Sequence, residues 1–197
     1  KISFKMKKNQ KITDIQLNNK NLKRRIIYLD NDLILEVTDI ILAEFDLYIG
    51  KYVNEKTINK IQEKELLLKA KKDAIRYLSY RARSEWEICN KLKNKKYPYI
   101  IIEETIDWLK EKELINDKSF ANSFVKDRIN KKPLGKIKLR EELYKKGIDK
   151  KIAENAISTF FIEEMDEIEL ARKMINQKMA SLKLKRRRNY HGIINSR

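Results

Sequence analysis

Two stretches of this sequence decide the fold: KNKKYPYIIIEETIDWL at residues 93–109 and YKKGIDKKIAENAISTF at residues 144–160. A shift of 51 residues superposes them, and Leu109 then falls on Phe160. A duplication at such a period predicts a tandem array of three-helix units, each resting its apolar face on its neighbour. The alternative is a chance alignment of two amphipathic helices, but the copies also share a chain break and a helix cap.

Capping signals mark where the helices of each unit begin and end. Ser84 and Glu87, in SEWE, form a capping box that starts one helix, and Pro98 suits the first position of the next. In the second copy Gly147 stands where a helix-ending glycine belongs, and Asp149 can cap the helix that follows. We therefore predict four segments: an N-terminal β extension plus a short helix at 1–53, a three-helix module 1 at 54–115, a three-helix module 2 at 116–163, and a shortened or truncated module 3 at 164–197.

The segment before the first module contains the candidate strands. Alternating apolar residues predict strands at 11–17, 24–29 and 33–37, separated by the polar turns NNKN and DND. In the first of them, Thr13, Ile15 and Leu17 should share one face. A short helix at 38–46 and a long helix at about 55–80, capped by Asn54, should follow. The overall fold class is thus mainly α: tandem three-helix repeats in a curved array, with a small N-terminal β-hairpin or meander extension that must pack on a helix to be stable.

The apolar positions of the modules recur at the helical period of 3.6 residues. We expect Cys89 and Trp108 on the apolar faces of module 1, and Ile137 with Leu139 and Leu143 on one face of module 2. A single cysteine excludes an intramolecular disulfide framework. Because the sequence has no apolar run as long as a membrane span and no signal peptide, we expect a cytoplasmic protein without a membrane partner.

Charge limits the partners that the chain can bind. The sequence has 46 basic and 29 acidic residues, a formal net charge of +17 and an isoelectric point near 9.7. Such a surplus favours a polyanionic partner, which can be nucleic acid, a membrane surface or an acidic protein, although solubility alone is the plainer reading.

Catalytic chemistry finds little support in the sequence. The one histidine, His191, allows no histidine-based triad and no multi-histidine metal site. Four scattered glycines form no phosphate-binding loop, and the adjacent glutamates of each Glu-Glu pair diverge on a helix. We assign no catalytic residue, no metal ligand and no cofactor, and we expect a protein that acts by binding and not as an enzyme.

Three motifs resemble those of the RecX family. They are YLSYRARSEWEICNKL at 77–92, LINDKSFANSFVKDRINKKPLGKIKLREELYKKGI at 114–148, and YHGIINS at 190–196. Members often carry Lys-Gly before the aromatic residue of the first module's second loop, whereas this chain has Lys95-Lys96 before Tyr97. The third module is compressed, its middle helix being reduced to SLKLKRRR at 181–188.

The resemblance to this bacterial family implies a regulator of the RecA recombinase. Such a protein lies along the groove of the RecA–single-stranded-DNA filament and restrains ATP hydrolysis and strand exchange, mostly as an inhibitor. Through RecA it influences homologous recombination, DNA repair and the SOS response to DNA damage. The partners implied are the RecA filament and single-stranded DNA, with double-stranded DNA as a further candidate, and a monomer is expected.

Basic side chains at the breaks between helices are the candidate binding residues. The first corner, just before the Ser84 cap, has Arg81 and Arg83, which suit bidentate contacts to phosphate or carboxylate, and Tyr80, which can stack on a base. The second corner surrounds Pro133 and Gly135. Its candidates are Lys126, Arg128, Lys131, Lys132, Lys136 and Lys138. The densest basic run, near the C-terminal end, adds Lys185, Arg186, Arg187 and Arg188.

Each group has a structural alternative. Arg81 and Arg83 can pair with Glu85, Glu87 or another local acid, and the basic run can be a frayed tail whose cations suit a helix C-terminus. As whole-protein alternatives, a plain nucleic-acid-binding protein would lack a recombinase partner, and an adaptor for an acidic protein would lack DNA affinity. Binding that follows DNA alone and falls steeply with salt would favour the former.

Overall fold

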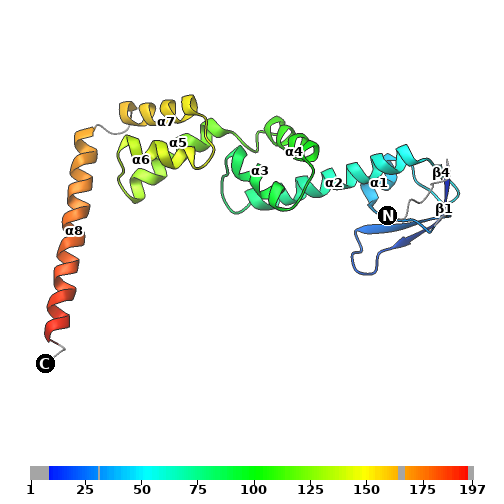
Figure 1. The fold of residues 1–197 in the computed structure, drawn as a ribbon, viewed down its shortest axis with the longest axis horizontal. Coiled ribbons are helices and arrows are strands. Elements are labelled where there is room, and N and C mark those ends of the chain that lie inside the picture. The colour runs from blue at the N-terminus through cyan, green and yellow to red at the C-terminus, as the bar shows by residue number, and fades with distance from the viewer. Residues whose placement is uncertain (1–8, 31, 164–166, 195–197) are drawn as a thin grey trace, which may run out of the picture. The chain divides into compact units, whose positions relative to one another are not determined.

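A computed structural model of the chain describes residues 9–30, 32–163 and 167–194, with side chains described over 9–30, 32–162 and 168–183. The strands are β1 (Gln10–Leu17), β2 (Arg24–Leu29), β3 (Ile34–Thr38) and β4 (Tyr52–Val53). The helices are α1 (Asp39–Glu44), α2 (Glu55–Leu78), α3 (Glu85–Asn94), α4 (Tyr99–Glu111), α5 (Asp117–Lys131), α6 (Lys136–Tyr144), α7 (Lys150–Glu163) and α8 (Glu167–Ile194). The fold is mainly helical with a small N-terminal sheet, so the predicted fold class is confirmed (Figure 1).

The chain forms two compact units. Unit 1 comprises Lys1–Tyr77 with Lys91–Asp107, and unit 2 comprises Leu78–Asn90 with Trp108–Arg197. The division passes through α3 and α4, and the module boundaries that we predicted from the sequence stay a prediction.

The sheet of unit 1 has four antiparallel strands in the order β3-β2-β1-β4. The three predicted strands are present, and the hairpins between them form the expected meander. Strand β4 was not predicted, because two residues are too few to show an alternating pattern. It pairs with the start of β1, where Gln10 lies opposite Val53 and Lys11 opposite Tyr52.

The predicted face of β1 holds for Ile15 and Leu17, which lie opposite Ile27 and Arg25, but it is wrong for Thr13, because a β-bulge between Ile12 and Asp14 breaks the alternation there. Ile12 is buried and Ile15 is half-buried against the same core, although they are three positions apart, whereas Thr13 and Leu17 are exposed. A bulge inserts one extra residue into one strand, so side chains beyond it change face. Strict period-two counting from Thr13 could not detect this irregularity.

The core of unit 1 lies between the sheet, α1 and the first turns of α2. Its buried side chains are Ile12, Ile27, Leu29, Leu35, Val37, Ile41, Leu47, Val53, Ile58 and Ile61. Asn54 caps α2 as predicted, because its side-chain oxygen accepts the backbone N–H of Thr57 at 2.8 Å. The extension is therefore packed on a helix, as a small sheet requires.

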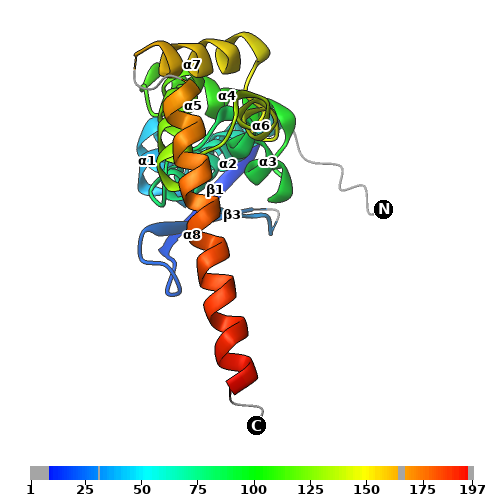
Figure 2. The same cartoon turned by 90° about the vertical axis from the view of Figure 1, so that its left-hand side faces the viewer.

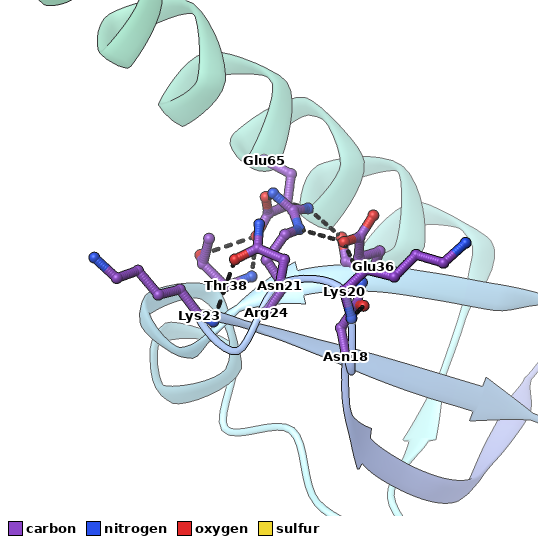
Figure 3. Close-up of polar contacts among 8 residues, drawn as sticks. All are labelled: Asn18, Lys20, Asn21, Lys23, Arg24, Glu36, Thr38 and Glu65. Carbon is purple, nitrogen blue, oxygen red and sulfur yellow. Dashed lines mark hydrogen bonds and ion pairs between the residues drawn. The ribbon is translucent and has the colours of Figure 1, made fainter.

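A polar cluster centred on Glu65 of α2 fixes the sheet to that helix (Figure 3). The Glu65 carboxylate accepts three hydrogen bonds: one from the Thr38 hydroxyl at 2.9 Å, one from the Thr38 backbone N–H, and one from the Arg24 guanidinium at 3.0 Å. Arg24 also pairs with Glu36 at 2.9 Å, and Asn18 donates to the same Glu36 carboxylate at 2.7 Å. Because the Glu65 side chain is only 11% exposed, these donors are needed to offset its desolvation.

Unit 2 contains the second three-helix bundle, in which α7 packs across α5 and α6 (Figures 1 and 2). Its core comprises Phe120, Ala121, Val125, Ile129, Leu139, Leu143, Ile148, Ala153, Ala156, Ile157, Phe160 and Leu170. Leu139 and Leu143 are fully buried as predicted, but Ile137 is 71% exposed, so its predicted place on the apolar face is wrong. Ile137 precedes the buried Leu139 by two residues, which is about half a helical turn.

The sequence duplication has counterparts in the structure. At an offset of 51 residues, the backbone carbonyls of Ser84 and Gly135 each accept the first intrahelical N–H of their helix, from Ile88 and Leu139 respectively. Leu109 and its counterpart in α7, Phe160, are both buried. Two other expectations for module 1 fit only in part, since Trp108 and Cys89 are half-buried and do not lie fully in the core.

The segment predicted as module 3 contains one long helix, α8, in the part of the chain that the structure describes. Leu170 packs into the core of unit 2. The Tyr190–Ser196 motif and the basic run at 185–188 lie outside the residues whose side chains are described. A third module as an independent unit stays a prediction.

Among the described residues, four turns share one geometry: a residue with left-handed backbone is followed by a residue whose N–H donates to the carbonyl five positions earlier. The bond from Ile148 N–H to Leu143 C=O (3.1 Å) surrounds Gly147 (φ 72°), as predicted for a glycine helix stop. The bond from Tyr97 N–H to Leu92 C=O (3.3 Å) surrounds Lys96 (φ 62°) at the equivalent position of the first copy. Asp46 and Glu113 occupy the other two such positions.

Lys96 should therefore be a strained position that glycine relieves. We expect Lys96→Gly to raise the free energy of unfolding by about 1 kcal/mol, because a side chain with a Cβ disfavours the left-handed region and glycine does not. Urea denaturation measures the change. Lys93→Gly, an exposed site within α3, is the matched control and should lower stability by about 0.5–1 kcal/mol. Equal destabilisation by both variants would contradict the turn assignment.

Candidate functional site

The first corner is built on the N-terminus of α3, where the predicted capping box is present. The Ser84 hydroxyl accepts the Glu87 backbone N–H at 3.2 Å, and the Glu87 carboxylate accepts the Ser84 backbone N–H at 3.4 Å. Reciprocal bonds of this kind satisfy two donors that the first turn of a helix leaves free. Ser84 is fully buried, so the cap lies inside the protein.

Glu87 is also the centre of a charged cluster. Its side chain, 8% exposed, accepts two hydrogen bonds from the Arg81 guanidinium, at 2.7 and 3.1 Å, and one from the Lys146 ammonium at 2.8 Å. Burial alone would raise the pKa of Glu87, but the hydrogen bonds and charges of Arg81 and Lys146 outweigh it and lower that pKa to about 2. The carboxylate is therefore ionised at any physiological pH.

The turn between α6 and α7 packs directly on this corner within unit 2. The Ser84 hydroxyl donates to the Lys146 carbonyl at 2.6 Å, and Gly147 lies so close to Trp86 that a Cβ on the glycine would overlap the indole side chain. The Glu85 backbone N–H donates to the Asp117 carboxylate at 2.8 Å. The sequence gives no signal for Lys146 or Gly147 here, because about 60 residues separate them from their partners.

Arg81 therefore pairs with Glu87, which was one of the alternatives left open by the sequence. The other residues of the first corner differ in exposure: Tyr80 is 75% exposed, whereas Arg83 is half-buried. The neighbouring Tyr77 is half-buried, and the Lys91 ammonium lies 5.4 Å from the centre of its ring. Of this corner, Tyr80 presents the most surface to a partner.

The second corner, between α5 and α6, has its own ion pairs. The Arg128 guanidinium binds the Glu142 carboxylate through two hydrogen bonds of 2.6 and 2.9 Å, which lower the pKa of Glu142. Lys138 pairs with Glu141 at 2.8 Å. The Lys136 ammonium lies 4.9 Å from the centre of the Phe161 ring, a cation–π contact.

Lys126, Lys131 and Lys132 of the second corner are exposed. Within the described residues, Lys131 and Lys132 form no ion pair. The adjoining helix α6 begins at Gly135 without a side-chain cap and has no acidic residue in its first turn. Its equivalent in the first copy, α3, has a serine cap and two glutamates there. Beside its own ion pairs, the second corner thus presents the exposed Lys131 and Lys132, which form none in the described residues, whereas Arg81 of the first corner is paired.

The remaining candidates, Lys185, Arg186, Arg187 and Arg188, lie outside the residues whose side chains the structure describes. The continuous basic stripe predicted across the corners stays a prediction. In the described ranges, no three His, Cys, Asp or Glu side chains gather as metal ligands, and no helix is both long and apolar enough to cross a membrane. What the described site offers chemically is binding of anions by exposed lysines.

Comparisons with known proteins identify the two copies. The family model for RecX, first three-helix domain, matches residues 70–109, and that for RecX, second three-helix domain, matches residues 116–157. Regulatory protein RecX of Bacillus velezensis is 36% identical over 153 residues, which cover 78% of this chain and 58% of that protein. Regulatory protein RecX of Clostridioides difficile is 32% identical over 147 residues, which cover 75% of this chain and 69% of that protein.

Solved structures agree with the sequence matches. A crystal structure of regulatory protein RecX superposes with a TM-score of 0.68 at 32% identity, covering 92% of this chain and 85% of that one. A crystal structure of RecX from Lactobacillus salivarius gives a TM-score of 0.50 at 32% identity, covering 58% of this chain and 76% of that one. The match to the Bacillus velezensis protein spans less than two thirds of that relative's length.

The Glu87 cluster leads to a pH-dependent prediction. Because the folded-state pKa of Glu87 is lowered from 4.5 to about 2, the carboxylate stabilises the fold fully above pH 4.5 and loses this effect as the pH falls toward 2. We expect Glu87→Gln to lower the free energy of unfolding by about 1–3 kcal/mol near neutral pH. The difference from the unaltered chain should shrink in acid, where Glu87 itself becomes protonated.

Denaturant titrations at a series of pH values measure this difference. Glu103→Gln, the same replacement at an exposed side chain of α4, is the control and should change stability by less than about 0.5 kcal/mol. A Glu87→Gln deficit that stays constant down to the lowest pH would show that the ion pairs do not stabilise the fold.

Proposed function

The chain belongs to the RecX family of regulatory proteins, and from this premise we propose that it binds the RecA–single-stranded-DNA filament and restrains its ATP hydrolysis and strand exchange. The observation that carries the proposal is the second corner with its exposed Lys131 and Lys132, which lies in the second RecX three-helix domain. The filament is a polyanion that combines DNA phosphates with protein, and a binding protein with this surface suits it.

The two corners have different roles in this proposal. At the first corner Arg81 and Lys146 both bind the buried Glu87 carboxylate within unit 2, so these charged groups stabilise the fold. The second corner places Lys136 and Lys138 in the first turn of α6, where cations are unfavourable to the helix dipole. An anion bound there would offset this local cost, and the exposed Lys131 and Lys132 beside it would add to the attraction.

The proposed mode of action is binding without catalysis, in the cytoplasm and as a monomer. Residues 55–197 carry 36 basic and 22 acidic side chains, so they contribute 14 of the 17 surplus positive charges. The same surplus favours a second candidate function, that of a helical nucleic-acid-binding protein with no recombinase partner. The two differ in the target: the regulator requires the filament, whereas the plain binder requires only DNA.

The rate of single-stranded-DNA-dependent ATP hydrolysis by RecA from the same host, titrated with this protein, tests the proposal. We expect the rate to fall at substoichiometric protein, and the fall to persist when excess free DNA is present. No effect on the rate would contradict the proposal. A fall that excess DNA abolishes would favour the plain nucleic-acid binder, because competition for DNA would then explain the inhibition.

A pair of variants tests the second corner in the same assay. Lys131→Glu with Lys132→Glu should raise the protein concentration needed for half-inhibition about tenfold, since two exposed cations become repulsive. Lys150→Glu with Lys151→Glu makes the same charge change at exposed positions of α7 and is the matched control. Equal losses in both double variants would assign the effect to net charge and remove the second corner from the site.

A further inference from the structure

We infer that the turn at residues 47–53, here called the Tyr48 turn, is a protein-docking surface that contacts a RecA protomer. Three large side chains point out of this short segment: Tyr48 is 55%, Ile49 60% and Tyr52 63% exposed. Turn tips are ordinarily polar, whereas aromatic and branched apolar side chains at an exposed tip are typical of protein-recognition sites. The inference rests on the proposed function, because the partner named is the filament.

The backbone of the Tyr48 turn is fixed on both sides. Lys51 N–H donates to the Tyr48 carbonyl at 3.1 Å, and Gly50 has a φ of 98°, which makes a β-turn with glycine at its third position. Gly50 N–H donates to the Ile12 carbonyl at 2.8 Å, and Ile12 N–H donates to the Lys51 carbonyl at 2.9 Å. These bonds attach the turn to β1.

Side chains complete the anchoring. Leu47 and Val53, at the two ends of the turn, are buried in the core of unit 1. The Lys51 ammonium donates to the carbonyls of Phe45 and Asp46, at 2.9 and 2.8 Å, and lies 5.6 Å from the centre of the Tyr48 ring. A fixed segment that presents exposed aromatic and aliphatic groups loses little conformational entropy on binding, as a preorganised docking site should.

Charge indicates what kind of partner covers these side chains. Residues 1–54 carry ten basic and seven acidic side chains, a surplus of three, against the 36 and 22 of residues 55–197, a surplus of 14. Lys51, within the turn, donates to the backbone carbonyls of Phe45 and Asp46 and pairs at 3.5 Å with the Asp46 carboxylate, which is 84% exposed. At the tip the described cation is thus already engaged, so this surface offers the phosphates of DNA or of a membrane less than the helical part does. It fits a protein surface that has an apolar pocket with cationic side chains at its rim.

The chain then has two kinds of contact for one filament. The helical part supplies cations for polyanionic surface, and the Tyr48 turn supplies an apolar anchor for a protein pocket. An anchor of this kind gives the filament an affinity that naked DNA does not share, because only the filament presents protein. The Tyr48 turn would thus help to distinguish a RecA-coated strand from a bare one.

Binding to two immobilised probes tests the inference: oligo(dT) alone, and oligo(dT) coated with RecA and a non-hydrolysable ATP analogue. Tyr48→Ser with Ile49→Ser should raise the dissociation constant for the coated probe about tenfold and leave that for oligo(dT) within about twofold. Leu17→Ser with Leu22→Ser removes exposed apolar side chains of the β1–β2 hairpin and is the matched control, with no expected change. Ile49→Lys alone provides a second variant, and thermal unfolding checks that each variant folds.

The outcomes separate the possible roles of the turn. Equal losses on both probes would mean that the Tyr48 turn binds DNA by stacking, and unchanged binding of the coated probe would mean that the turn has no docking role. Both results overturn the inference and leave the proposed function standing. Failure of the unaltered chain to prefer the coated probe would overturn the proposed function and this inference together.

Discussion

The buried carboxylate of Glu87 is the group on which the arrangement of unit 2 depends. It must be ionised to accept hydrogen bonds from Arg81 and Lys146 at once, and it caps α3 through the Ser84 backbone N–H. Removing water from a charge is costly, and in this case two cations and the capping bond offset the cost. One side chain thereby joins the N-terminus of α3 to the turn between α6 and α7, so the geometry of the first corner follows from a single satisfied charge.

The second copy begins its helix at the equivalent position but has different side chains at this corner. Gly135 replaces the serine cap at the same offset, and Lys138 stands where the first copy has the buried glutamate. In the first copy Trp86 lies against a neighbouring turn and is 50% exposed, whereas its equivalent Ile137 is 71% exposed. Repeats tolerate such divergence because stability comes from the shared core positions, which leaves the corners free to differ in function.

Most of the fold could be predicted from the sequence, because its signals are local. The capping box at Ser84, the stop at Gly147 and the Asn54 cap each involve residues within a few positions of one another, and all are present in the structure. What could not be predicted depends on contacts distant in the sequence or on a single inserted residue. Lys146, one of the two partners of Glu87, lies about 60 residues away, and the bulge after Ile12 changes the face of the residues beyond it without changing the composition of β1.

The candidate site was predictable in kind but not in detail. Counting cations identifies both corners, yet counting cannot distinguish Arg81, which pairs with a buried acid, from Lys131, which forms no ion pair in the described residues. The useful quantity is therefore the charge left after the internal pairs are made, and it differs between corners of the same repeat. The same reasoning applies to the Tyr48 turn, where Lys51 adds to the formal charge but its ammonium already donates hydrogen bonds to the carbonyls of Phe45 and Asp46. A basic protein can thus present a surface that polyanions do not favour, which allows one chain to bind nucleic acid and protein through separate faces.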